Sequence, residues 1–145
     1  MVTDPIKEAV ERANSSGLLT PTLFERAAAL VDERGWFGMK YPDPGGANRI
    51  TSRVCVVNAI MEAVDELIVV LVYGSLPRLP DRRKLTRVRE VQLRDDLWTA
   101  TSVLLQRKLN VSGIGSVFAA NDAQLESEGA DWAGSVLRHI AHDLR

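Results

Sequence analysis

The stretch VCVVNAIMEAVDELIVVL, residues Val54 to Leu71, decides the fold class of this chain. Its apolar side chains recur every three to four residues, which places them on one face of an α-helix. They are Val54, Val57, Ile60, Met61, Val64, Leu67, Ile68 and Leu71. Such a stripe predicts a central helix packed into the core, with Thr51 or Ser52 as its N-cap. Residues 67–73 lack a polar face, so a β-strand is the alternative for that part.

Two helices are predicted before this stripe. Asp-Pro at positions 4–5 and Thr-Pro at positions 20–21 are typical of helix N-termini, because the first side chain can accept from free N–H groups and proline loses no bond there. Ser15 to Gly17 should end the first helix, and Gly35 should end the second. Thr22 with Glu25 adds the spacing of a capping box.

Further helices are predicted in the second half of the chain. A charged helix is expected over about residues 81–109, and a break near Asp95 and Asp96 is left open as an alternative. The short apolar run 114–120 fits either a helix or a strand. Asp131 is the expected cap of a last helix, whose apolar stripe reaches the final residues.

The segment GWFGMKYPDPGGANRI, residues 35–50, holds four glycines, two prolines and three aromatic residues. This composition interrupts any helical period and predicts a long ordered loop that its aromatic side chains attach to the core. The chain is therefore predicted to be mostly α, with residues 1–145 forming one compact helical bundle of about five helices. The alternative is an α+β fold with one or two short strands.

Composition excludes several classes of protein. The balance of 46% hydrophobic and 26% charged residues is that of a folded globular domain. The net charge of −1 gives no overall attraction to nucleic acid, and a single cysteine cannot form an internal disulfide. The N-terminal residues do not resemble a signal peptide, and the apolar run 67–73 is too short to cross a bilayer. We therefore expect a cytoplasmic protein without membrane contact.

Cys55 is the main candidate for chemistry. A position near a helix N-terminus can lower the pKa of a thiol, and His139 or His142 could act as the base of a Cys-dependent hydrolase or transferase. The alternative is that Cys55, which has valine neighbours, is a small core residue, because free cysteine is among the most buried residue types. We favour this second interpretation, and hence no catalytic residue.

Metal and nucleotide sites are not indicated. His139 and His142 are three positions apart, and Asp143 or Cys55 could complete a ligand set, but no HExxH or CxxC motif accompanies them. The Gly-rich segments 44–46 and 112–116 lack the phosphate-binding spacings of nucleotide sites. The sequence thus predicts no metal and no cofactor.

Charge is distributed unevenly along the chain. Residues 78–108 contain nine basic and four acidic residues, whereas residues 109–145 contain two basic and five acidic residues. The basic cluster Arg82, Arg83, Lys84 and Arg87 is the predicted partner-binding segment. Binding of nucleic acid through residues 78–94 is an alternative, but no aromatic residue is interleaved before position 98. The opposite charges of the two regions also permit a homo-oligomer.

Three short segments together resemble a known family. They are Gly35-Trp36 after an alanine-rich helix, CVVNAI at 55–60, and ANDA at 120–123 before the last helix. The chain resembles small uncharacterised helical proteins of actinobacteria and actinophages. The resemblance implies a phage- or prophage-encoded helical protein and brings no established activity. We therefore predict a non-enzymatic protein-interaction module that uses the basic segment and an apolar helix surface near residues 67–76.

Overall fold

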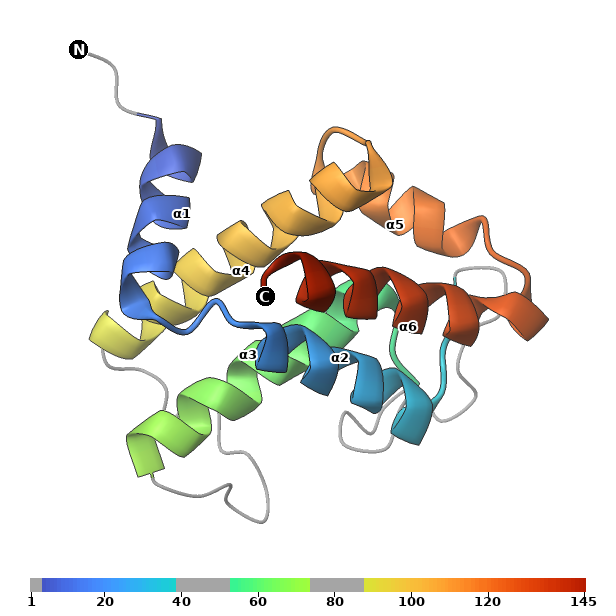
Figure 1. The fold of residues 1–145 in the computed structure, drawn as a ribbon, viewed down its shortest axis with the longest axis horizontal. Helices are drawn as coiled ribbons and strands as arrows, with labels where there is room; N and C mark the ends of the chain where they lie inside the picture. The colour runs from blue at the N-terminus through green and yellow to red at the C-terminus, as the bar shows by residue number, and fades with distance from the viewer. Residues whose placement is uncertain (1–3, 39–52, 74–87) are drawn as a thin grey trace.

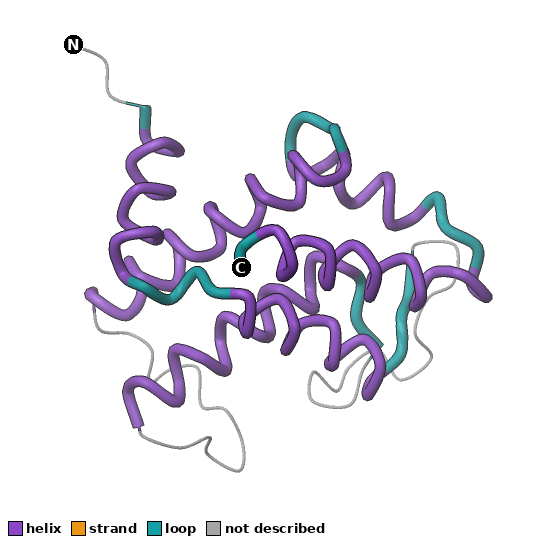
Figure 2. The backbone as a smooth tube through the Cα atoms, viewed as in Figure 1, coloured by secondary structure: helices purple, strands orange, loops and turns teal. Residues whose placement is uncertain are grey.

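The computed structural model describes residues 4–38, 53–73 and 88–145, and the chain is mostly α (Figures 1 and 2). The described residues form the helices α1 (Pro5–Ser16), α2 (Pro21–Arg34), α3 (Val56–Tyr73), α4 (Val88–Leu109), α5 (Ile114–Asp122) and α6 (Glu126–Asp143). The predicted helical fold is confirmed. The strand alternatives for 67–73 and 114–120 are wrong, because both runs are helical. Within the described ranges, β-type backbone pairing is limited to isolated bridges, such as the parallel bridge between Trp36 and Val54.

Helix α1 has the predicted ends. The Asp4 carboxylate accepts from the N–H groups of Ile6 and Lys7 at 3.0 and 3.3 Å. Gly17 follows the helix with a φ of 74°, a left-handed conformation that glycine adopts without strain. These two caps explain why the polar N-terminal stretch forms a defined helix.

Helix α2 also begins at its predicted proline, but the predicted capping box is wrong. Thr20 is the N-cap residue and its side chain makes no capping hydrogen bond. Thr22 already lies inside the helix, so it cannot cap it. Pro21 needs no partner for its nitrogen, which reduces the need for a side-chain cap.

Helix α3 begins later than the sequence predicts. Its first residue is Val56, so the N-cap position falls on Cys55. Thr51 and Ser52 lie outside the described residues, and both precede the N-cap position by at least three residues. The backbone before the helix is extended, because the Val54 N–H donates to the Gly35 carbonyl at 2.9 Å.

Two predicted boundaries in the second half are also wrong. Helix α4 continues through Asp96 without a break, because that side chain is buried in an ion pair with Arg12 of α1 instead of capping a helix. Helix α6 begins at Glu126, so Asp131 lies within it. The Leu125 carbonyl accepts from the N–H groups of residues 128 and 129, so Leu125 is the N-cap residue in place of Asp131 and the helix starts nearly two turns earlier.

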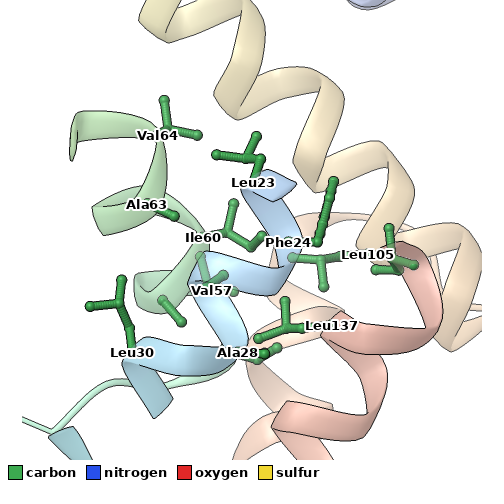
Figure 3. Close-up of a cluster of buried hydrophobic side chains, with 14 of the residues drawn as sticks. Leu23, Phe24, Ala28, Leu30, Val57, Ile60, Ala63, Val64, Leu105 and Leu137 are labelled. Atoms are coloured by element: carbon green, nitrogen blue, oxygen red, sulfur yellow. The ribbon is translucent and has the colours of Figure 1, made fainter. Parts of the chain in front are cut away.

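The helices enclose one cluster of buried apolar side chains. Helix α2 lies beside α6, which runs in the opposite direction, and its other side packs against α3 (Figure 1). Helix α1 packs against α4. The centre of the cluster contains Leu23, Phe24, Ala28, Leu30, Val57, Ile60, Ala63, Val64, Leu105 and Leu137 (Figure 3). The stripe that defines α3 therefore faces the core, except that Leu71, assigned to it from the sequence, is 53% exposed.

Part of the predicted loop after α2 lies within the described residues. Trp36 is buried and Phe37 is partly buried against the core, so the aromatic side chains hold the start of this segment as predicted. Residues 39–52, and with them most of the predicted loop, lie outside the described residues.

Candidate functional site

Cys55 lies at the N-terminus of α3, and its sulfur is part of the helix cap. Its Sγ accepts from the N–H of Asn58 at 3.3 Å, and its carbonyl accepts from the N–H of Ala59 at 2.9 Å. The residue is only 4% exposed. Burial raises the pKa of the Cys55 thiol, because the low-dielectric interior disfavours the thiolate. An activated nucleophile requires the opposite shift.

The two histidines lie apart from this thiol. His139 and His142 are exposed on α6, and neither is a hydrogen-bond partner of Cys55 in the described part of the chain. Asp143 instead forms an ion pair with Lys108 at 2.5 Å, and this hydrogen bond lowers the pKa of the Asp143 carboxyl. Over residues 4–38, 53–73 and 88–145, no three His, Cys, Asp or Glu side chains gather into a set that could hold a metal ion.

A buried asparagine organises the region around Cys55. The Asn121 Oδ1 accepts from the Trp36 Nε1 at 2.8 Å and from the Val56 N–H at 3.1 Å. Its Nδ2 donates to the Phe37 carbonyl at 3.1 Å and is 3.4 Å from an Asp122 carboxylate oxygen. Asn121 is completely buried, so these bonds satisfy a group that would otherwise be costly to bury. The side chain joins α5, the start of α3 and the segment after α2.

The sequence analysis did not single out Asn121 as a functional or structural residue. A sequence signal was present, because Asn121 lies four positions after Val117 and therefore on the same helix face, and Val117 is fully buried in the structure. The segments 35–36, 55–60 and 120–123 all contribute residues to this cluster, through Trp36, Val56 and Asn121. Gly129 of α6 completes it, since a Cβ at that position would lie 2.2 Å from the Trp36 ring. The cluster is therefore a packing and hydrogen-bonding centre, with no accessible reactive group.

The candidate binding surface lies between α2 and α3. The two helices border a groove of about 260 Å³. Its lining residues are Thr20, Thr22, Leu23, Arg26, Ala63, Glu66, Leu67 and Val70. Leu23 and Ala63 are buried and form an apolar floor, while the side chains nearer the surface are only partly covered. A groove of this kind can accept one or two apolar side chains.

A charged pair connects the two helices that border this groove. The Arg26 guanidinium donates to both carboxylate oxygens of Glu66, at 2.7 and 3.1 Å, and also to Glu33 at 3.0 Å. The Glu66 carboxylate, together with Glu33, raises the pKa of Arg26. Two-pronged arginine–carboxylate pairs have a fixed geometry, so this contact ties α2 to α3 along the groove.

Two exposed apolar residues extend the groove toward the end of α3. Val70 is 40% exposed and Leu71 is 53% exposed. Val70 lines the groove, and Leu71 lies one helical turn after the lining residue Leu67; the groove and these two exposed side chains are called here the α3 surface. The predicted interface near residues 67–76 overlaps this surface at Leu67, Val70 and Leu71, and residues 74–76 lie outside the described residues.

The predicted basic cluster is not part of the described structure. Arg82, Arg83, Lys84 and Arg87 all lie outside the described residues. Farther along the same basic segment, the Arg94 guanidinium stacks over the Trp98 ring at 4.8 Å from its centroid, and its side chain is 22% exposed. The Arg94 guanidinium therefore already makes a cation–π contact within the protein.

No family model, curated protein or solved structure matches the chain. No helix within the described ranges is both long enough and apolar enough to cross a membrane. Among the surfaces of the described residues, the α3 surface combines an open groove with exposed apolar side chains.

Proposed function

We propose that this chain is a non-enzymatic protein-interaction module that binds a protein partner through the α3 surface. The observation that carries the proposal is the exposure of Val70 and Leu71 beside the apolar groove between α2 and α3. Exposed apolar side chains next to a preformed groove are typical of protein interfaces. The buried thiol of Cys55, with its raised pKa, argues against the alternative of a Cys-dependent hydrolase or transferase.

The expected binding mode is insertion of apolar side chains from the partner. Complete burial of a valine or leucine side chain contributes about 1.5–3 kcal/mol, and Val70 and Leu71 are already partly covered. Burial of these two side chains and of Leu67 by a partner gives a modest affinity. Tight binding therefore needs further contacts at the edge of the interface. The sequence provides these contacts after α3, where Arg82, Arg83, Lys84 and Arg87 favour a partner with acidic residues around its apolar centre.

The biological setting is part of the same proposal. A small helical adaptor without catalytic groups agrees with the resemblance to proteins of actinobacteria and actinophages, and with a phage- or prophage-encoded role. A second copy of the chain is one partner that the charge distribution allows, because the region after α4 is acidic. Nucleic acid fits less well, since the cation among the groove residues, Arg26, is already paired with Glu66 and Glu33 and is not free to contact phosphate groups.

The proposal is tested by introducing charge into the α3 surface. Leu71→Lys should weaken partner binding at least tenfold, since it places a cation against an apolar contact. Phe118→Lys is the matched control, because Phe118 is also an exposed apolar helix residue, at 38%, but lies on α5. Both variants should unfold at the temperature of the unmodified protein within a few degrees.

Binding is measured for the partners that co-purify from the cells in which the chain naturally occurs. Self-association of the chain is measured by sedimentation. Loss of one interaction in Leu71→Lys and its retention in Phe118→Lys supports the α3 surface. Equal binding by both variants contradicts it. The nucleic-acid alternative is supported instead if the chain binds nucleic acid in a salt-sensitive way and charge reversal at Arg82, Arg83 and Lys84 abolishes that binding.

A further inference from the structure

Helix α1 is attached to the rest of the molecule mainly through α4. It lies at one edge of the fold, and α4 is the described helix against which it packs most extensively (Figure 1). Ala9 and Ala13 are its buried residues, and Val10 is partly buried. Helix α2, by contrast, buries a phenylalanine, two leucines, a valine and two alanines. Because alanine side chains bury little apolar surface, α1 is held by weaker apolar packing than α2.

A charged contact makes this attachment specific. The Arg12 guanidinium donates to both oxygens of the Asp96 carboxylate at 2.9 Å, and the Gln92 side chain donates to one of them at 2.9 Å. The Asp96 side chain is only 5% exposed, whereas the Arg12 side chain is 50% exposed. The site on α4 is therefore a carboxylate oriented by a glutamine. It accepts a helix that presents an arginine beside two alanines four residues apart.

The connection between α1 and α2 can act as a hinge. It consists of residues 17–20, between the end of α1 and the start of α2. Gly17 has a φ of 74°, and no atom lies within 4 Å of the position that a Cβ would take there. Glycine adopts left-handed and right-handed backbone conformations about equally well. A backbone rotation at Gly17 would therefore redirect α1 while α2 stays packed in the core.

We propose that α1 exchanges between two copies of this chain, so that α1 of each molecule docks on α4 of the other. The exchanged dimer has the same contacts as a single molecule, with Arg12 of each copy paired to Asp96 of the other. When α1 opens, Asp96 loses its cation, so the site selects a helix with the same charge pattern, and a second copy supplies one. The exchange uses α1 and α4 and is separate from the proposed α3 surface.

Two charge-reversed variants test the exchange by sedimentation. Arg12→Asp and Asp96→Arg each place like charges at the contact, so neither variant can form the pair within its own chain. In an equimolar mixture, the opposite charges meet between the two chains. The mixture should contain about tenfold more dimer than either variant alone, the ratio for regaining one charged hydrogen-bonded pair. The double variant, which carries both substitutions in one chain, is the control and should contain no more dimer than the unmodified protein.

Isotope-filtered NMR tests the unmodified protein, where no substitution can disturb folding. Labelled and unlabelled copies are incubated together at millimolar concentration, and contacts between the copies should join the methyl groups of Ala9 and Ala13 to α4. The proposal is overturned if no such contacts between copies occur. It is also overturned if the mixture of folded variants stays monomeric, or if the dimer content is equal in the mixture and in each variant alone. That last result would assign the dimer to another surface, such as the α3 surface, which all these variants retain.

Discussion

The Trp36 indole donates a hydrogen bond to the Asn121 side chain across 2.8 Å, joining residues that are 85 positions apart in the chain. The same asparagine oxygen accepts from the first N–H group of α3. One buried amide therefore fixes both the segment that leaves α2 and the start of the helix that carries the proposed interface. Several predictions about stability depend on this contact.

Asn121→Ala should lower the free energy of unfolding by about 2 kcal/mol or more. The substitution leaves the Trp36 Nε1 and the Val56 N–H buried without an acceptor, and each unpaired buried donor costs about 1–3 kcal/mol. Denaturant unfolding followed by circular dichroism measures the change. Asn14→Ala is the control, since Asn14 is exposed on α1 and its loss should alter stability by less than about 0.5 kcal/mol. Equal effects of the two substitutions would show that Asn121 has no special role.

Two glycine substitutions should change stability in opposite directions. A Cβ at position 129 would lie 2.2 Å from the Trp36 ring, so Gly129→Ala should destabilise the protein by about 1–3 kcal/mol or more. A Cβ at position 115 of α5 meets no atom within 4 Å, so Gly115→Ala should stabilise it by about 0.4–1 kcal/mol. Thermal melts of the two variants check both signs. A stable Gly129→Ala variant would mean that α6 does not pack closely on Trp36.

Cys55 should react slowly with thiol reagents in the folded protein. The residue is 4% exposed and burial raises its thiol pKa, so at pH 7 the reactive thiolate is rarer than in a free cysteine. We expect labelling to be on the order of 100-fold slower than in denaturant, the ratio for an opening free energy of a few kcal/mol. His139→Ala and His142→Ala should leave the rate unchanged. Rapid labelling at pH 7 that either substitution slows would support a Cys–His catalytic pair instead.

The ion pair between Arg12 and Asp96 should make stability depend on acid pH. The Nε and Nη2 atoms of Arg12 each donate to one oxygen of the Asp96 carboxylate at 2.9 Å. This contact lowers the pKa of Asp96. A carboxyl with a depressed folded pKa stabilises the protein above its unfolded pKa of about 3.9 and loses that contribution as pH falls below it. Asp96→Asn should therefore lower the free energy of unfolding by about 1–3 kcal/mol at pH 7.

The difference in unfolding free energy between Asp96→Asn and the unmodified protein should shrink as the pH is lowered from 4 toward 2. Asp95→Asn, at the neighbouring exposed position, is the control and should have little effect at either pH. A constant difference across this pH range would show that the Asp96 charge does not contribute through Arg12.

The helices could be predicted from the sequence where the signal is local. The caps at Asp4 and Gly17 and the stripe of α3 depend on neighbouring residues, and the structure has them as expected. The errors at Asp96 and Asp131 have a different origin. Aspartate favours helix starts, but Asp96 is held inside α4 by Arg12, 84 positions away. Helix α6 begins before Asp131 and already includes Gly129, which packs against the distant Trp36, a contact that no local pattern encodes.

The candidate site was predictable in part for the same reason. An apolar surface on the second half of α3 follows from the loss of a polar face in residues 67–73. The groove does not, because it requires α2 to pack beside α3, with Arg26 paired to Glu66, 40 positions away. The position of Asn121 against Trp36 likewise depends on the arrangement of α5 relative to the segment after α2.

The most direct test of the proposed interaction surface is site-specific photo-crosslinking in the cells in which the chain naturally occurs. A photoreactive phenylalanine replaces Leu71 in one variant and Phe118 in a second, since both positions are exposed and lie on different helices. The account predicts one defined protein adduct, either with a second copy of the chain or with another protein, from position 71 and none from position 118. The same adducts from both positions, or none from position 71, would contradict it.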